Sequence, residues 1–190
     1  KIVVFLATLF FAAQSMSISQ EKNFPKKGII EFSGSVTYAN YSLTYQGEKG
    51  DATSLISFSP QAGYFFTDNF EFGLSSGVIM LPGLSFQSQS GTSITALQLF
   101  ATPAYHFLLD GSTLTPFVEA QLGFTSLVST GVNRSGFSYG GRGGIKYTPV
   151  DHIIFTFAGQ YLSINLKASG ETERTGYNYF TIGAGVGVYF

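Results

Sequence analysis

The segment IEFSGSVTY, residues 30–38, alternates apolar and polar residues with a period of two. Its apolar face holds Ile30, Phe32, Gly34, Val36 and Tyr38, and its polar face holds Glu31, Ser33, Ser35 and Thr37. Successive side chains of a β-strand point to opposite faces of the sheet, whereas a helix repeats every 3.6 residues. The segment therefore predicts a strand with one apolar and one polar face.

The same alternation recurs along the chain after residue 29. Seven further segments show it, at residues 56–66, 70–80, 97–107, 116–124, 137–147, 153–161 and 179–190. Short turn-like connections at 67–69, 108–114 and 148–152 alternate with longer polar ones at 46–53, 82–93, 129–136 and 168–176. Eight strands joined in this way predict an all-β fold, an eight-stranded antiparallel up-and-down barrel with two unlike ends.

Residue size indicates which face of that barrel points inward. The chain has 20 Phe, 11 Tyr and 23 Gly, and the polar faces of the strands are rich in Gly, Ser and Thr. The interior of an eight-stranded barrel is only just wide enough for side chains to fill, so it has no room for all the aromatic rings. We therefore expect a transmembrane barrel with its apolar face toward lipid. A soluble lipocalin-like binder, with that face inward, is the distant alternative.

Aromatic residues also gather near the short-turn end, as expected of a girdle at a membrane interface. They are Tyr64, Phe66, Phe70, Phe72, Tyr105, Phe107, Tyr147, Phe155 and Phe190.

Composition excludes several other classes of protein. Hydrophobic residues make up 44% and charged residues 11%, yet no apolar run reaches the roughly 18 residues of a membrane-spanning helix. A net charge of −1 disfavours a nucleic-acid partner. The two histidines and the lack of cysteine give no metal-site spacing, and we expect no cofactor. Because His106 and His152 both fall at the expected periplasmic end, away from the outer leaflet, we expect no enzyme acting on lipid there.

The first residues are expected to lie outside the barrel. Lys1 precedes the apolar stretch 2–13, and the small and polar residues QSMSISQ follow. These are the three parts of a secretory signal peptide, which we place at residues 1–19 with cleavage between 13 and 19. The other interpretation is a buried helix. A lead-in at 20–28 and the barrel at 29–190 complete the expected organisation.

Three segments resemble a known family. GYFFTDNFEFGL (63–74), TPFVEAQLGF (115–124) and GVGVYF (185–190) resemble the small eight-stranded outer membrane proteins of Gram-negative bacteria, the outer membrane protein A/X type. The resemblance implies a protein of the cell outer membrane in contact with its lipid. It also implies that the last strand is read by the barrel-assembly machinery, through Ala184, Val186, Val188 and Phe190. We expect a monomer.

The expected lumen face carries five charged residues, Glu31, Glu71, Glu119, Arg142 and Lys146, with Gln61, Gln98, Gln121, Gln160 and His106 beside them. An unpaired charge in a narrow lumen costs several kcal/mol, so we expect a paired structural network that plugs the barrel. The alternative is a gate or an ion path. A hairpin closed symmetrically near residues 130–136 would place Glu119 opposite Lys146 within two residues, which predicts a contact of Glu119 with Lys146 or Arg142.

Two features do not fit the alternation. Phe100 and Phe117 fall on the expected lumen face, and the seventh segment changes parity around residues 161–164, which predicts a bulge or an exit from the membrane.

The expected function is a structural or surface-interaction role, with an unknown extracellular ligand on the long loops. A narrow pore or a conduit for small solutes or hydrophobic molecules is the alternative, and the apolar MLPGLSF (80–86) could line its entrance.

Overall fold

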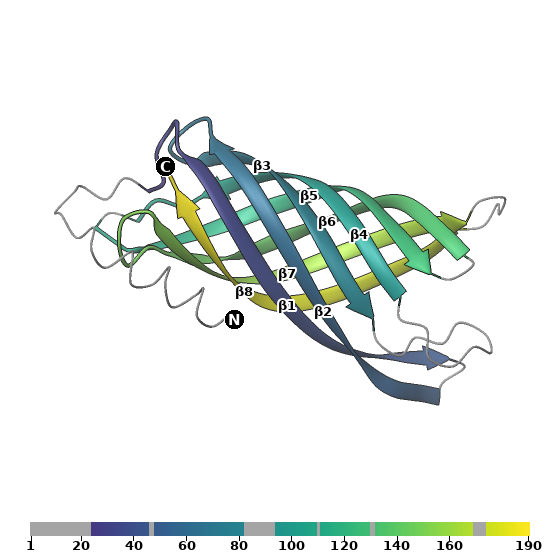
Figure 1. Ribbon diagram of the computed structural model, residues 1–190. Coiled ribbons are helices and arrows are strands. Elements are labelled where there is room, and N and C mark those ends of the chain that lie inside the picture. The colour runs from purple at the N-terminus through teal and green to yellow at the C-terminus, as the bar shows by residue number, and fades with distance from the viewer. Residues whose placement is uncertain (1–23, 46–47, 82–93, 110, 130–131, 169–173) are drawn as a thin grey trace, which may run out of the picture.

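The computed structural model describes residues 24–45, 48–81, 94–109, 111–129, 132–168 and 174–190, so the expected signal peptide and most of segment 80–86 lie outside the described residues. The strands are β1 (Ile30–Tyr45), β2 (Glu48–Phe65), β3 (Phe70–Leu81), β4 (Ile94–His106), β5 (Leu114–Ser129), β6 (Val132–Tyr147), β7 (Ile153–Ala168) and β8 (Arg174–Tyr189). Each pairs antiparallel with its neighbours, and β8 pairs with β1, which confirms the eight-stranded closed barrel (Figure 1). Within the described ranges, no helix is long and apolar enough to span a membrane.

The outer face of the barrel is apolar, as predicted. Side chains from all eight strands are at least 40% exposed there, among them Phe32, Phe58, Leu74, Leu99, Phe124, Tyr139, Phe157 and Ile182. In water these side chains would form an exposed apolar patch far larger than the few hundred Å² that is usual on soluble monomeric proteins. The aromatics expected near the short-turn end point outward too, including Tyr105 at 46% and Phe190 at 70%. This surface is suited to lipid.

The barrel closes where its first and last strands meet. Glu31 through Tyr38 of β1 pair with Tyr189 through Ile182 of β8, and Phe190 exchanges two backbone hydrogen bonds of 3.0 Å with Ile30. Beyond Tyr38, β1 pairs with β2 and β8 pairs with β7, and the two hairpins diverge (Figure 1). β1 and β8 are thus hydrogen-bonded along the part of β8 whose outer face is apolar, where lipid offers no hydrogen-bond partners to the backbone.

Several strands are longer than the alternation predicted. The expected loops 46–53 and 129–136 are largely strand, because β2 begins at Glu48 and β6 at Val132, and residues 174–176 of the expected loop 168–176 belong to β8. These extra residues lie beyond the part of each strand whose outer face is apolar. On β8, for example, the outward residues there are Gly176 and Asn178. A strand that is polar on both faces carries no period-two hydrophobic signal.

The expected register of β5 with β6 was wrong by four residues. Glu119 lies opposite Arg142, and Lys146 lies opposite Thr115. The pairing continues to Ser129 and Val132, so the turn is centred two residues earlier than the expected loop. A two-residue shift of the turn moves each cross-strand partner by four.

Of the two explanations predicted for the parity change near residues 161–164 of β7, the bulge was wrong, and the exit from the membrane stays a prediction. The even-numbered residues point inward along the whole strand, from Ile154 at 0% exposure through Leu162 at 0% to Leu166 at 1%. The pairing of β7 with β8 runs without a shift from Ile153 to Lys167. The alternation is lost in the sequence because apolar residues here occupy the inner face as well.

Candidate functional site in the barrel lumen

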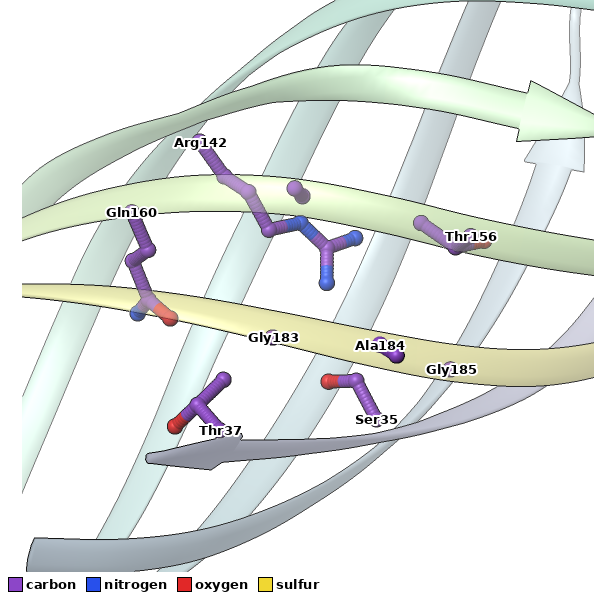
Figure 2. Close-up of a pocket in the computed structure, with 9 residues that line it drawn as sticks. Ser35, Thr37, Arg142, Thr156, Gln160, Gly183, Ala184 and Gly185 are labelled. Atoms are coloured by element: carbon purple, nitrogen blue, oxygen red, sulfur yellow. The ribbon is translucent and has the colours of Figure 1, made fainter. Parts of the chain in front are cut away.

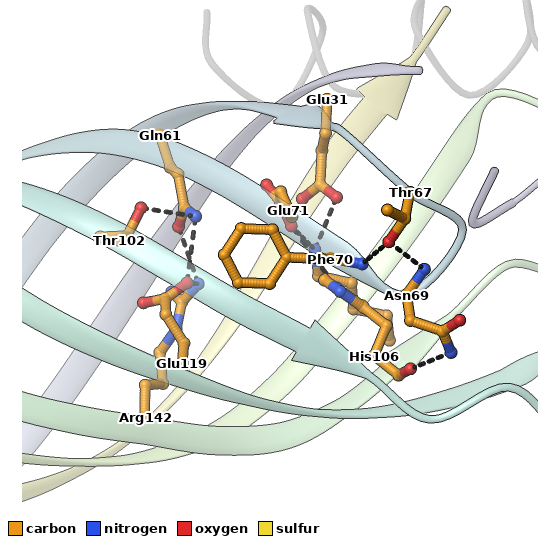
Figure 3. Close-up of polar contacts among 11 residues, drawn as sticks. Glu31, Gln61, Thr67, Asn69, Phe70, Glu71, Thr102, His106, Glu119 and Arg142 are labelled. Carbon is orange, nitrogen blue, oxygen red and sulfur yellow. Dashed lines mark hydrogen bonds and ion pairs between the residues drawn. The ribbon is translucent and has the colours of Figure 1, made fainter. Parts of the chain in front are cut away.

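The lumen nearest the short turns holds a buried ionic cluster centred on Lys146. The Lys146 ammonium donates to Glu31 Oε2 at 2.6 Å and to Glu71 Oε2 at 3.1 Å. The three residues come from β6, β1 and β3, and each is at most 2% exposed. Figure 3 shows the two glutamates converging from different strands. The contact thus ties together strands that are not neighbours in the sheet.

Aromatic rings surround this cluster. His106 is fully buried, with Nε2 3.5 Å from Glu71 Oε2, and its ring lies 4.9 Å from that of Phe65 and 5.9 Å from that of Phe117. The Lys146 ammonium lies 5.4 Å from the Phe117 ring centroid, within cation–π range. This explains why Phe117, one of the two unexplained aromatics, occupies the lumen face.

A second polar cluster lies further into the barrel, around Arg142. Its Nη2 donates to Gln61 Oε1 at 2.7 Å and to Glu119 Oε2 at 2.9 Å, and Gln61 Nε2 donates to Glu119 at 3.0 Å. Glu119 therefore contacts Arg142, one of its two expected partners (Figure 3). Lys146 pairs with Glu31 and Glu71 instead. Gln121 donates to Glu119 at 3.0 Å and accepts from Gln160 at 2.7 Å, so the network reaches β7.

Glycines provide the space that these side chains occupy. A Cβ added at Gly63 would overlap the carboxylate of Glu71, and one added at Gly73 would lie 2.6 Å from Thr102 Oγ1 and 3.2 Å from Gln61 Nε2. Real Cβ atoms essentially never approach other atoms within 3.0 Å, so these inward glycines on β2 and β3 leave room for the Glu71 carboxylate and the Thr102 hydroxyl.

A small cavity lies beside Arg142, with a volume of about 10 Å³. Ser35 and Thr37 on β1 face Arg142, Thr156 and Gln160 across it (Figure 2). The Nε of Arg142 is buried and has no hydrogen-bond partner within the protein. A space of this size, lined by polar groups, accommodates about one water molecule.

The lumen becomes apolar toward the long-loop end. Gln98 donates to Thr125 Oγ1 at 3.2 Å and to the Tyr179 hydroxyl at 3.5 Å. At this level and above lies an apolar cluster of inward residues, Phe100, Leu162, Ile164 and Leu166, with Leu127 and Tyr179 packed against it. Phe100, the other unexplained aromatic, belongs to this cluster. Sequence reasoning missed the cluster because its β7 members are interleaved with outward residues such as Tyr161.

The residues expected to form the assembly signal lie on β8 and directly after it. Ala184 and Val186 face outward on β8, Val188 is half-buried on the same face, and Phe190 is exposed directly after the strand. Their role in assembly stays a prediction. Among the described residues, no three His, Asp or Glu side chains group as metal ligands would. The paired charges of the lumen bind one another and bridge strands.

Together these features define a class of protein: an eight-stranded barrel with an apolar outer face and paired charges among its inward side chains. No protein-family model matches the chain, and no curated protein matches it. Solved structures do. Neisserial surface protein A covers 86% of this chain and 98% of its own, with 16% identity and a TM-score of 0.64.

Two other solved structures are similar over nearly their whole length. The outer membrane protein OprG of Pseudomonas aeruginosa has 16% identity and a TM-score of 0.61, covering 90% of this chain and 99% of its own. The outer membrane protein W of E. coli has 13% identity and a TM-score of 0.56, covering 88% and 100%. The chain therefore has the fold of the small eight-stranded outer membrane β-barrels, as its sequence resemblance implies.

Proposed function

We propose that this protein is an integral outer membrane β-barrel of a Gram-negative bacterium. The apolar outer face of the barrel carries the proposal, because side chains such as Phe124 at 66% and Ile182 at 68% exposure need a lipid solvent. The fold of the similar solved structures supports it. A soluble lipocalin-like binder would need these side chains inside, where the described barrel places charged and small polar groups instead.

The location has a direct test. The full-length chain, expressed in a Gram-negative host, is expected in the outer membrane fraction and should migrate differently on a gel before and after boiling, because the folded barrel resists detergent. A soluble periplasmic protein without heat-dependent migration would contradict the proposal.

We further propose that the lumen is closed and that the role of the protein is structural or one of interaction at the cell surface. Two sets of contacts support closure: the contacts that cross the lumen, from Lys146 to Glu31 and Glu71 and from Arg142 to Gln61, and the packed cluster around Leu162 above them. On this proposal, the two polar clusters block the passage of hydrated ions along the lumen. The long-loop side would then carry the interaction, with an extracellular ligand of unknown identity.

Planar-bilayer conductance tests closure. The folded protein is expected to give no discrete single-channel steps. A matched variant, Arg142→Ala with Glu119→Ala, removes one cation and one anion and shortens both side chains, so any conductance should first be visible there. Steps of the unmodified protein, already present before this change, would contradict closure.

A conduit for small hydrophobic molecules is the second candidate function. The inward apolar residues Phe100, Leu162 and Leu166 favour it, because they line the lumen toward the long loops. Uptake of a short alkane into vesicles containing the protein would support it, provided that Leu162→Glu, which places a charge on that lining, abolishes the uptake. Equal uptake by empty vesicles would contradict it.

We also propose that the protein works as a monomer without a cofactor and that the barrel-assembly machinery recognises its last strand. The expectation that it is not an enzyme stays a prediction.

A further inference from the structure

The lead-in before β1 enters the mouth of the barrel at the short-turn end. The ring of Phe24 lies 4.9 Å from that of Tyr189, 5.4 Å from that of Phe65 and 6.3 Å from that of His106. These three residues point inward from β8, β2 and β4, and each is at most 3% exposed. A side chain that touches inward residues on three separate strands lies within the cross-section of the mouth.

The backbone of the lead-in is fastened to the barrel wall. The Gly28 amide donates to the Phe65 carbonyl at 2.8 Å, and the Lys27 amide donates to Asp68 Oδ1, in the β2–β3 turn, at 2.8 Å. Gly28 has a φ of 91°, which L side chains rarely adopt. This left-handed position lets the chain reverse between Phe24 and β1, and the two hydrogen bonds hold the reversal in place.

The ring of Phe24 covers the ionic cluster. Its centroid lies 5.6 Å from the Lys146 ammonium, and Ile29 and Ile154 complete an apolar cluster with Phe65 and Tyr189 around it. Lys146, Glu71 and His106 lie directly behind this apolar layer and are 2%, 0% and 0% exposed. Ion pairs gain strength where water is excluded, so the layer both seals the mouth and strengthens the contacts behind it.

We propose that the lead-in Phe24–Gly28 is a built-in stopper, which closes the short-turn end of the lumen against water and ions through the ring of Phe24. Phe24 follows the expected signal-peptide cleavage region, so it stays in the exported chain. The stopper goes beyond the proposed function, because it concerns one mouth of the barrel whether or not the rest of the lumen conducts.

The lack of native cysteine permits a clean test. Thr115→Cys places a single thiol on the lumen face opposite Lys146, where Thr115 is 4% exposed. In the folded protein, its reaction with a small water-soluble methanethiosulfonate reagent reports water entry at the mouth. The rate of thiol modification is measured in the Thr115→Cys protein and in the double variant that also carries Phe24→Ala. The matched control is Phe66→Ala, which removes an equal side chain from the outer face at the same end, where Phe66 is 51% exposed.

The stopper predicts slow modification in the parent and in Phe66→Ala, and a rise of about tenfold or more in Phe24→Ala, because protection lasts only as long as the local contact does. Equal rates with and without Phe24, or fast modification of the parent, would overturn it. Heat-dependent migration confirms that each variant is folded.

If Phe24→Ala does not fold, the rate of thiol modification is measured in Gly28→Ala instead. This variant keeps the Phe24 ring but strains the chain reversal at residue 28. A folded Gly28→Ala barrel is expected to react several-fold faster than the parent, since alanine at this φ favours release of the lead-in. A rate equal to that of the parent would then overturn the proposal. Conductance is not part of this readout, so failure of the closed-lumen proposal gives a different result.

Discussion

The inward side chains in the two halves of the lumen make different kinds of contact. Near the short turns, Lys146 and Arg142 hold three buried carboxylates by short charged hydrogen bonds. Toward the long loops, Phe100, Leu162 and Leu166 fill the same cross-section by apolar packing. The polar half depends on each charge having its partner, whereas the apolar half depends on volume. The described inward residues are thus held by charge pairing at one end of the barrel and by apolar packing at the other.

The largest effect is expected for Lys146→Met in the polar half. The substitution keeps the length of the side chain but leaves Glu31 and Glu71 buried without their shared cation. Removing one partner of a buried pair costs about 3–5 kcal/mol, and we expect a loss of that size in the free energy of unfolding. Urea titration in lipid vesicles measures it.

Lys167→Met is the matched control for that prediction, since Lys167 lies exposed on β7. We expect a change within about 0.5 kcal/mol for the control. If the two substitutions had equal effects, the cluster around Lys146 would not contribute to stability.

Leu162→Ala tests the apolar half. Leu162 is fully buried in the lumen, so we expect a loss of about 2–5 kcal/mol from the cavity and the lost contacts. Leu122→Ala removes the same atoms from the outer face, where Leu122 is 49% exposed, and should cost less because lipid fills the space. The same titration compares them, and a larger loss at Leu122 would contradict the inward packing of β7.

Gly63→Ala tests the fit between backbone and charge. The new Cβ would displace the Glu71 carboxylate, and overpacking of this kind costs about 1–3 kcal/mol. Gly143→Ala is the control, because its Cβ would lie 3.6 Å from the nearest atom, the Phe117 carbonyl oxygen. We expect the control to be stabilised by about 0.5–1 kcal/mol. An equal loss at both positions would show that the strand itself, and not Glu71, requires glycine.

The smallest effect is expected for Glu71→Gln. The substitution keeps the volume and leaves Lys146 paired with Glu31 at 2.6 Å, one cation with one anion. We therefore expect a change within about 1 kcal/mol in the unfolding titration, which is the scale of one neutral hydrogen bond. A loss as large as that of Lys146→Met would mean that both carboxylates must be charged.

The sequence was sufficient to predict the barrel and the facing of most strands, because apolar and polar residues such as Phe32 and Ser33 alternate wherever one face meets lipid and the other a polar lumen. It was not sufficient where this contrast ends. On β7, Leu162 and Ile164 are apolar on the inner face, and the alternation of two face types disappears. On β6 the extension carries Arg134, Ser135 and Gly136, so no apolar face marks it in the sequence.

Charge partners were predicted only in part, for a geometric reason. Glu119 and Arg142 lie on adjacent strands, so hairpin register brings them within reach even with an error. Lys146 and Glu31 are 115 residues apart and meet across the lumen, which no local register describes. The Phe24 stopper carries no periodic signal, since it precedes the first strand and depends on one reversal at Gly28.

Leucine methyl contacts with lipid report which face of the barrel meets the membrane, because leucines lie on both faces. The protein is deuterated except for its leucine methyl groups and is studied by NMR in lipid with protonated acyl chains. We predict nuclear Overhauser effects to the acyl chains from Leu97, Leu99 and Leu122, which are 49%, 60% and 49% exposed, and none from the buried Leu162 and Leu166. Acyl-chain contacts from Leu162 and Leu166, with none from Leu97, Leu99 and Leu122, would contradict the account.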